Sequence, residues 1–285
     1  MQALIAKARR SYHAGLLANG VLTIDSNGVP SNADRSSTIS IAIAQGIARR
    51  LMANKQEKAL GQTAGAKFEQ LNMEFIEATF PRLQNLRPGK WHIAKLGNRN
   101  SIKTSSFAQY EHLDYLSQLT KEDARLAASM GNDYMVAPDV VIYRETESDE
   151  VINGQQPIVD GSICEHSDLR KVCGGLPILH ASVSAKWTMR SDRAQNSRTE
   201  ALGLIRNRKG HLPHIVVVTG EPMPSRIASL ALGTGDIDCV YHFALNELIE
   251  AVNDTKAEDS IEMLRILIVG KRLKDISDLP LDLAV

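Results

Sequence analysis

Two acids, a serine and a lysine in the second half of the chain could together support hydrolysis of a phosphodiester bond. Asp139 stands in a β-branched run over 137–143, which is typical of a strand. Lys186 lies near the end of an alternating segment over 178–188, and Ser184 precedes it by two residues on the same strand face. Magnesium prefers oxygen ligands and keeps several waters, so one or two carboxylates can hold it. We therefore expect a divalent-metal site at the ends of these strands.

The second acid is expected on the helix that follows the lysine strand. Glu200 falls within a predicted helix over 192–207, one turn before Leu204 in its apolar stripe, so its carboxylate should lean toward the sheet. Taken singly, Asp139 is typical of a turn, Glu200 of a solvated helix face and Lys186 of a surface cation. Their combination at this spacing favours a catalytic site over these separate structural roles.

The charge of the chain is balanced overall but concentrated locally. Its 285 residues carry 33 basic and 33 acidic side chains, which argues against a non-specific nucleic-acid binder, because such proteins are usually strongly basic. The segment from Lys186 to Lys209 nevertheless holds seven basic residues against two acidic ones. A basic stripe on a neutral protein fits an anionic partner that is met at a single face.

Composition and length indicate one globular domain, 1–285. Apolar residues make up 43% of the chain, and no apolar run is long enough to span a bilayer, so we expect no membrane partner. The N-terminal segment lacks the features of a signal peptide. Three cysteines, Cys164, Cys173 and Cys239, match neither a disulfide framework nor a zinc template, which favours a cytoplasmic location.

The spacing of apolar residues predicts helices in the first half of the chain and strands alternating with helices in the second. The predicted helices span 2–17, 38–53, 63–80, 108–130, 192–207, 224–232, 244–253 and 258–269. The predicted strands span 91–96, 137–143, 178–188, 214–218 and 238–242. This order implies an α/β fold with a mixed sheet flanked by helices. The segment 144–177 has no clear period and is predicted to be an irregular surface insertion.

The candidate catalytic residues also match a family pattern: Pro138-Asp139, Ser184-Ala185-Lys186 and Glu200 resemble the active site of the PD-(D/E)XK nucleases. They are similar to the branch of type II restriction endonucleases in which the second acid has moved from the lysine strand to the following helix. Ser184 stands where the commoner pattern has that acid. The resemblance extends through 186–219 and 271–285 and over nearly the full chain. It implies a restriction-endonuclease-like core and cleavage of duplex DNA.

The resemblance also implies how a metal is held. The family works with two Mg²⁺ ions at the scissile phosphate, which suits a reaction whose attacking and leaving oxygens both need stabilising. It implies that Asp139 is the central ligand and that Glu200 and Glu69 are outer acids. Lys186, which would orient water and offset phosphate charge, and Ser184 complete the catalytic set. Glu69 has the alternative of a solvated helical position.

Base recognition is expected from the cluster that directly follows the lysine strand, Arg190-Ser191-Asp192-Arg193. Arginine can donate two hydrogen bonds to guanine, and aspartate can accept one from cytosine, so the cluster suits consecutive G·C pairs. Ser191 and Asp192 would equally well cap a helix. The resemblance implies that Arg190, Asp192 and Arg193 contact a central CCGG.

An outer G·C pair is implied by the same resemblance. Asp34 would contact that pair, with Gln62 and Arg226 approaching from the minor groove. Asp34 has the alternative of being the N-cap of the helix that follows it. The implied site is GCCGGC, cut after the first G to leave a 5′-CCGG overhang.

The expected partners are double-stranded DNA and further copies of the chain. A palindromic site has two-fold symmetry, so at least a symmetric dimer is expected, and the resemblance implies a homotetramer that binds two duplexes. Two other classes compete. A non-catalytic sequence-specific DNA-binding protein would need the basic stripe but not Asp139, Lys186 and Glu200. A metal-dependent nucleotide hydrolase would usually carry a P-loop, which the sequence lacks.

Overall fold

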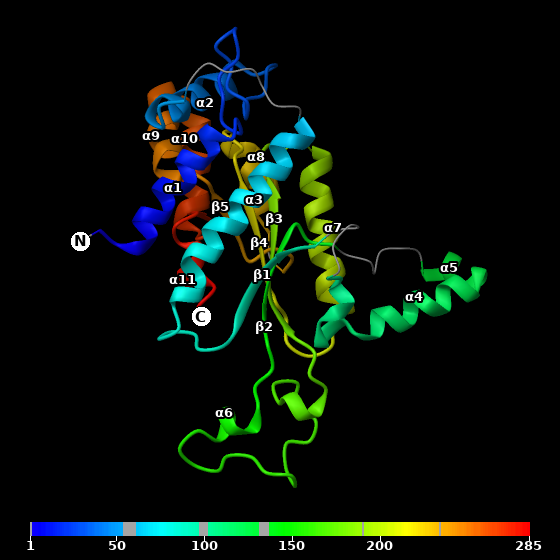
Figure 1. Ribbon diagram of the computed structural model, residues 1–285. Coiled ribbons are helices and arrows are strands. Elements are labelled where there is room, and N and C mark those ends of the chain that lie inside the picture. The colour runs from blue at the N-terminus through cyan, green and yellow to red at the C-terminus, as the bar shows by residue number, and fades with distance from the viewer. Residues whose placement is uncertain (1, 54–60, 97–101, 131–136, 190, 234) are drawn as a thin grey trace.

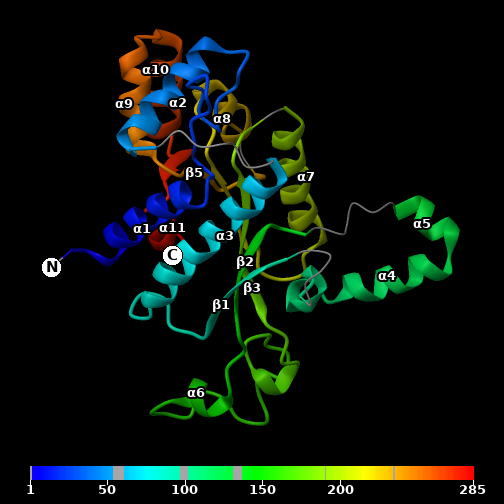
Figure 2. The ribbon, with the colours of Figure 1, turned by 45° about the horizontal axis from the view of Figure 1, so that its top comes forward.

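A six-stranded mixed sheet forms the centre of the molecule, with helices packed around it (Figures 1 and 2). The computed structural model describes residues 2–53, 61–96, 102–130, 137–189, 191–233 and 235–285, but not the side chains at 61, 62, 130 and 191–194. In spatial order the strands are β1 (Trp91–Lys95), β2 (Val140–Arg144), β3 (Ile178–Lys186), β4 (His214–Thr219), β5 (Cys239–His242) and β6 (Leu273–Asp275). The mixed α/β sheet flanked by helices that the sequence predicts is confirmed.

Strand direction changes once across the sheet. β1, β2 and β3 pair antiparallel, and β3 to β6 run parallel. Val140 lies opposite Val183, so the start of β2 meets the end of β3. Lys186 in turn pairs with Thr219 at the end of β4. The register therefore brings the residue before β2 and the last residues of β3 and β4 to one edge of the sheet.

The helices agree with the apolar periodicity to within a few residues at most positions. They are α1 (Leu4–Ala18), α2 (Thr38–Arg50), α3 (Gly61–Thr79), α4 (His112–Glu122), α5 (Ala124–Met130), α6 (Asp149–Asn153), α7 (Ser191–Asn207), α8 (Pro224–Ala231), α9 (Leu245–Thr255), α10 (Glu258–Val269) and α11 (Leu279–Asp282). Short 3-10 helices cover Phe80–Arg82, Thr104–Ser106, Ala108–Tyr110 and Lys171–Cys173. None of the helices in the described ranges is both long and apolar enough to cross a membrane.

β3 departs from the half-buried strand that its alternating sequence predicts. All its residues from Leu179 to Ala185 are buried, because α3 and α7 lie on opposite sides of the strand. The polar residues of the alternation must then find partners inside the protein. His180, for example, places Nε2 at hydrogen-bond distance, 2.7 Å, from the carbonyl oxygen of Leu283. The alternation reflects polar residues with specific partners and not a solvated face.

The single helix predicted over 108–130 is wrong, because the chain breaks into a 3-10 turn, α4 and α5. Asp123 separates the two α-helices in an extended conformation. Its Oδ1 accepts hydrogen bonds from the backbone N–H groups of Arg125 (2.8 Å) and Leu126 (3.2 Å), which caps α5. An aspartate that caps a new helix competes with continuation of the old one.

The insertion over 144–177 is largely irregular, as predicted, and projects from one end of the sheet (Figure 1). A buried arginine holds it together. Arg170 donates two hydrogen bonds to the carboxylate of Asp149, at 2.9 and 2.6 Å. It also donates to the carbonyls of Asp160, Ile163 and Cys164. The hydrogen bonds of this one guanidinium thus hold together a segment that has little apolar core of its own.

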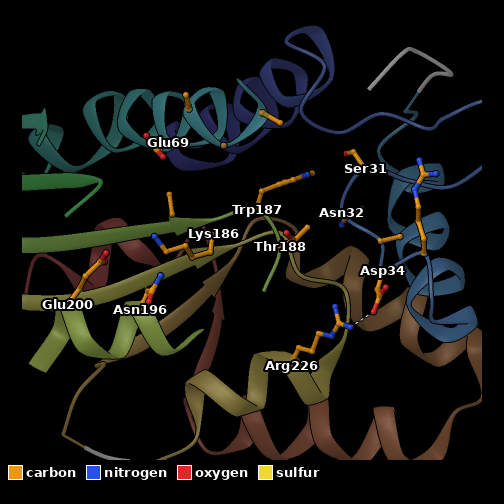
Figure 3. A pocket seen from close by; sticks show the side chains of 16 residues that line it. Ser31, Asn32, Asp34, Glu69, Lys186, Trp187, Thr188, Asn196, Glu200 and Arg226 are labelled. Atoms are coloured by element: carbon orange, nitrogen blue, oxygen red, sulfur yellow. Dashed lines mark hydrogen bonds and ion pairs between the residues drawn. The ribbon is translucent and has the colours of Figure 1, made fainter. Parts of the chain in front are cut away.

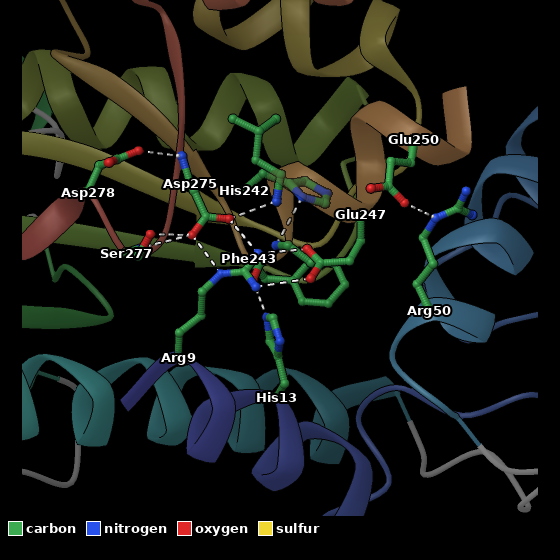
Figure 4. A network of polar contacts seen from close by, with 12 residues as sticks. Arg9, His13, Arg50, His242, Phe243, Glu247, Glu250, Asp275, Ser277 and Asp278 are labelled. Atoms are coloured by element: carbon green, nitrogen blue, oxygen red, sulfur yellow. Dashed lines mark hydrogen bonds and ion pairs between the residues drawn. The ribbon is translucent and has the colours of Figure 1, made fainter. Parts of the chain in front are cut away.

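The first helix is tied to the C-terminal edge of the sheet by a second arginine (Figure 4). Arg9 on α1 donates to both carboxylate oxygens of Asp275 on β6, each at 2.8 Å, and to Glu247 on α9 at 3.0 and 2.6 Å. Burial of these charges is offset because each has a partner. β6 itself was not predicted, since three residues containing Lys274 and Asp275 show no apolar pattern.

Candidate active site

Asp139 and Lys186, which are 47 residues apart, are in direct contact. The Nζ of Lys186 donates to Oδ2 of Asp139 at 3.0 Å, and the backbone N–H of Ala185 donates to the same oxygen at 2.8 Å. Asp139 immediately precedes β2, and the antiparallel pairing of β2 with β3 places it beside the end of β3. The sheet thus assembles the first two members of the predicted catalytic set.

Glu69 and Glu200 approach Lys186 from opposite sides. In Figure 3, Lys186 lies between α3, which carries Glu69, and α7, which carries Glu200. Glu69 also forms an ion pair with Lys95 of β1 at 3.3 Å. The structure therefore favours a site position for Glu69 over a solvated helix position, and Glu200 leans toward the sheet as its spacing predicts.

The electrostatics of the two glutamates show that they share one environment. Burial raises the pKa of Glu69, and the nearby charge of Asp139 raises it further, against the opposing effect of Lys95. Burial likewise raises the pKa of Glu200, with Lys186 opposing and Asp139 adding to the shift. Acids that repel one another in a partly desolvated site are stabilised in their ionised form by a nearby cation. Lys186 supplies one positive charge, and a divalent cation would supply two more.

The residues present fit a hard divalent cation. Among the described residues, no three His, Cys, Asp or Glu side chains are grouped closely enough to enclose a metal ion. Magnesium does not require such a cage, because it retains waters and is commonly held by one or two carboxylates. Oδ2 of Asp139 is occupied by Lys186 and Ala185, and no described residue donates to its Oδ1. The acidic side chains around Lys186, those of Asp139, Glu69 and Glu200, offer only oxygen atoms as ligands, as magnesium prefers.

Ser184 lies beneath this site. It is buried, and its Oγ is 3.4 Å from Oγ of Ser197 on α7. It shares a strand face with Lys186, as predicted, but it does not line the adjoining cavity. Its contact joins β3 to the helix that carries Glu200.

A cavity of about 590 Å³ is lined both by three members of the predicted catalytic set, Glu69, Lys186 and Glu200, and by residues expected to contact the outer base pair (Figure 3). Asp139 does not line it. Its walls come from the end of β3, from α3 and α7, from the loop at 31–35 and from α8. The charged and amide side chains that line it are Asn32, Asp34, Arg35, Glu69, Lys186, Asn196, Glu200 and Arg226. Residues expected to cleave and residues expected to contact the outer base pair thus line one cavity.

Asp34 and Arg226 form an ion pair within this cavity. The guanidinium of Arg226 donates to Oδ2 of Asp34, and the backbone and hydroxyl of Ser36 donate to Oδ1 at 3.0 and 2.8 Å. The Ser36 hydrogen bonds, together with Arg226, lower the pKa of Asp34 to about 2. The alternative that Asp34 caps α2 is wrong, because Ser37 is the N-cap and accepts from the N–H of Ser40. Asp34 instead closes a turn and faces Arg226.

The Arg190-Ser191-Asp192-Arg193 cluster lies largely outside the described residues. Arg190 itself is not described, and neither are the side chains of Ser191, Asp192 and Arg193. The same holds for the side chain of Gln62. The backbone of α7 begins at Ser191, directly after the loop that leaves β3.

Several residues of the site were not singled out from the sequence. Asn196 lines the cavity one turn before Glu200, so its helical spacing was an available signal. Lys95 had no such signal, since its contact with Glu69 depends on how β1 packs against α3. Trp187 follows Lys186 and packs its ring 5.0 Å from that of Phe68, which anchors the end of β3 under α3.

Comparisons with known proteins identify the relatives of the chain. The family model described as NgoMIV restriction enzyme matches residues 12–285. The chain is 49% identical to the type II restriction enzyme NgoMIV of Neisseria gonorrhoeae over 286 residues, which covers 100% of both chains. A structure titled as a complex of restriction endonuclease PspGI with substrate DNA matches 98% of this chain and 90% of its own, at 15% identity and a TM-score of 0.25. A TM-score of that size carries no structural argument.

Proposed function

The chain belongs to the NgoMIV restriction enzyme family, and on that premise we propose that it cuts duplex DNA at the palindrome GCCGGC. It is a type II restriction endonuclease, a site-specific deoxyribonuclease. The proposed cut follows the first G and leaves a 5′-CCGG overhang. The observation that supports this most is the single cavity in which Lys186, Glu69 and Glu200 lie beside the Asp34–Arg226 pair.

Restriction endonucleases generally depend on a divalent metal, and we assign two Mg²⁺ ions to Asp139, Glu200 and Glu69. Bound Mg²⁺ would lower the pKa of a water and offset the charge that builds up on the phosphate. Asp139 holds the ammonium group of Lys186 at the cavity wall, where it can orient water and contact a phosphate oxygen. Ser184 keeps β3 in contact with the helix that carries Glu200.

Recognition is assigned to two groups of residues. The inner CCGG would be contacted by Arg190, Asp192 and Arg193, whose donors and acceptors match guanine and cytosine edges. The outer pair would be contacted by Asp34, with Gln62 and Arg226 on the minor-groove side. Support for the second group comes from the cavity, because Asp34 and Arg226 line it together with Lys186.

We further propose a homotetramer in which two dimers each hold one duplex, located in the bacterial cytoplasm. The two-fold symmetry of a palindrome supports at least a dimer, because each strand then meets its own active site. A single domain, 1–285, would carry both recognition and cleavage. The continuous buried core, which runs from Tyr12 to Leu283, supports that organisation.

The decisive experiment is digestion of a plasmid that contains GCCGGC, with Mg²⁺, followed by sequencing of the fragment ends. We expect discrete fragments whose ends map between the first G and the following C. A non-catalytic DNA-binding protein would give a gel shift and no fragments, and a nucleotide hydrolase would give neither. Fragments that end at a different sequence would refute the proposed site while leaving the nuclease assignment intact. The matched control is the Lys186→Ala variant, which should leave the plasmid uncut.

A further inference from the structure

The segment from Thr219, the last residue of β4, to Met223 contacts four parts of the cavity wall: the end of β3, the loop at 31–35, the residues just before α7 and the start of α8. Thr219 donates its hydroxyl to the carbonyl of Lys186 at 2.8 Å. The N–H of Gly220 donates to the same carbonyl at 3.2 Å. The backbone of the catalytic lysine is therefore held from β4, at the point where β3 ends.

Gly220 connects this segment to the loop that carries Asp34. Its carbonyl accepts a hydrogen bond from Nδ2 of Asn32 at 2.8 Å, and Asn32 is buried two residues before Asp34. A Cβ atom at position 220 would lie 2.4 Å from the ring of Trp187 and 2.8 Å from its carbonyl oxygen. Only glycine allows the backbone at 220 to lie so close to Trp187, so this approach is encoded in the sequence.

Glu221 links two of these parts, the residues just before α7 and the start of α8, through one carboxylate. It is fully buried, and its Oε2 accepts from the N–H of Met189 at 2.8 Å, two residues before α7 begins. Its Oε1 accepts from the N–H of Met223 at 3.2 Å. Met223 is the N-cap of α8, and Arg226 stands in the first turn of that helix. Oε1 also lies 4.0 Å from Nη1 of Arg226.

The fully buried position of Glu221 is costly, which suggests that its contacts serve a purpose beyond packing. Burial raises the pKa of Glu221 to about 7, against the opposing effect of the Met189 and Met223 hydrogen bonds and of Arg226, while Asp34 raises it. Prolines at 222 and 224 leave Met223 as the only amide donor of that stretch and restrict its backbone. A neutral apolar residue in this place would fill the space but leave both amides unpaired.

We propose that Glu221 is a positioning residue for specificity, which holds Asp34 and Arg226 in register with the end of the lysine strand. Through it, the loop before α7 and the start of α8 move as one unit, and Gly220 adds the Asp34 loop to that unit. Correct contact with the outer base pair is thereby coupled to placement of Lys186. This role rests on the proposed function, and it goes beyond that function by adding a residue that contacts neither DNA nor metal.

The test compares the Glu221→Gln variant with the unaltered enzyme on two duplexes, GCCGGC and ACCGGT, which differ only in the outer pair. Glutamine keeps the shape and one acceptor but sets an amide donor against one of the two backbone N–H groups. Single-turnover cleavage rates with Mg²⁺ and competition binding with Ca²⁺ are measured on both duplexes. We expect the ratio of the two rates, and of the two affinities, to fall about tenfold, which is the size of one impaired base contact.

The ratio separates positioning from folding, because a smaller folded fraction lowers activity on both duplexes equally. The control is Glu247→Gln, which weakens the Arg9 network in Figure 4 and should leave the ratio unchanged, because neither Arg9 nor Glu247 lines the cavity. An unchanged ratio in Glu221→Gln overturns the positioning role and leaves the proposed function standing. If Glu221→Gln does not fold, the same ratio is measured for Glu221→Asp, whose side chain is too short to reach both amides, and that ratio decides. Failure of the unaltered enzyme to cut GCCGGC refutes the proposed site and this role with it.

Discussion

Arg226 on α8 donates a hydrogen bond to the carboxylate of Asp34, 192 residues earlier in the chain, and both side chains line the cavity that contains Lys186. Each group therefore offsets the charge of the other before any nucleic acid arrives. The low pKa of Asp34, about 2, means that its carboxylate is an acceptor at any pH at which the enzyme works. An acceptor that stays ionised suits the exocyclic amino group of cytosine.

The first prediction concerns Asp34 itself. The Asp34→Asn variant retains the size of the side chain but places an amide donor where a cytosine amino group would need an acceptor. We expect cleavage of GCCGGC to fall about tenfold, as for one lost base contact, and cleavage of ACCGGT to change little. Single-turnover rates on both duplexes measure this. Equal loss on the two duplexes would show that Asp34 contacts no base of the outer pair.

The second prediction separates cleavage from binding. Replacing Asp139 by Ala removes a proposed metal ligand and the acceptor of Lys186, and replacing Lys186 by Ala removes the cation at the cavity wall. Both variants should lose cleavage with Mg²⁺ and retain specific binding with Ca²⁺ in a gel-shift assay, because the base contacts lie elsewhere. Lys90→Ala, at an exposed lysine near Glu145, is the control and should cut normally. Near-normal cleavage by either active-site variant would contradict the assignment.

The third prediction addresses the inner CCGG. Losing Arg190 or Arg193 should cost about 1–3 kcal/mol of binding free energy at the cognate site, the value of a bidentate contact to guanine. Random DNA should be bound almost as well as by the unaltered enzyme. Salt dependence provides the second measurement, since a residue that contacts only phosphate reduces the slope of affinity against salt on every sequence. Equal weakening on cognate and random DNA would therefore assign these arginines to the backbone.

The fourth prediction links the burial of Glu221 to stability. The pKa of Glu221 is about 7 in the folded protein, above the ordinary value of 4.5. Below pH 4.5 its carboxyl group is therefore neutral in both the folded and the unfolded protein, and as pH rises it ionises first in the unfolded protein. Relative to the Glu221→Gln variant, the unaltered protein should lose about 3 kcal/mol of unfolding free energy between pH 4.5 and about 7, with little further loss above that. Urea unfolding of both proteins at pH 5 and pH 8 checks this. Parallel pH profiles would show that Glu221 is ionised throughout.

The fifth prediction is assembly. A tetramer that holds two duplexes should cut a plasmid with two sites faster than a plasmid with one, because linkage raises the local concentration of the second site. Light scattering should give the mass of four chains of 31.3 kDa. A one-site plasmid supplemented with a short cognate duplex is the control, and its cutting should speed up. A dimeric mass with equal rates on both plasmids would remove the tetramer and leave the nuclease assignment intact.

The sequence alone predicted the architecture and much of what the structure brings together around Lys186. Apolar periodicity located α3 and α7 closely, and it placed Lys186 at the end of its strand, because these segments bury continuous stripes that leave a clear pattern. Glu200 was placed toward the sheet by its spacing from Leu204. Where local chemistry competed with periodicity the prediction failed, as at Asp123, whose side chain caps a new helix inside an apolar repeat. β6 was missed because three residues are too few to show a period.

Only the tertiary structure decided which distant residues share a charge or a hydrogen bond. The Asp34–Arg226 ion pair, the contact of Lys95 with Glu69 and the hydrogen bond from Met189 to Glu221 all join segments far apart in the chain. Such contacts follow from strand order and register, which bring the ends of β3 and β4 to one edge of the sheet. The type of a residue determines which groups its side chain is able to bind. Its actual partner depends on the packing of the whole chain, and a linear pattern carries no signal for that.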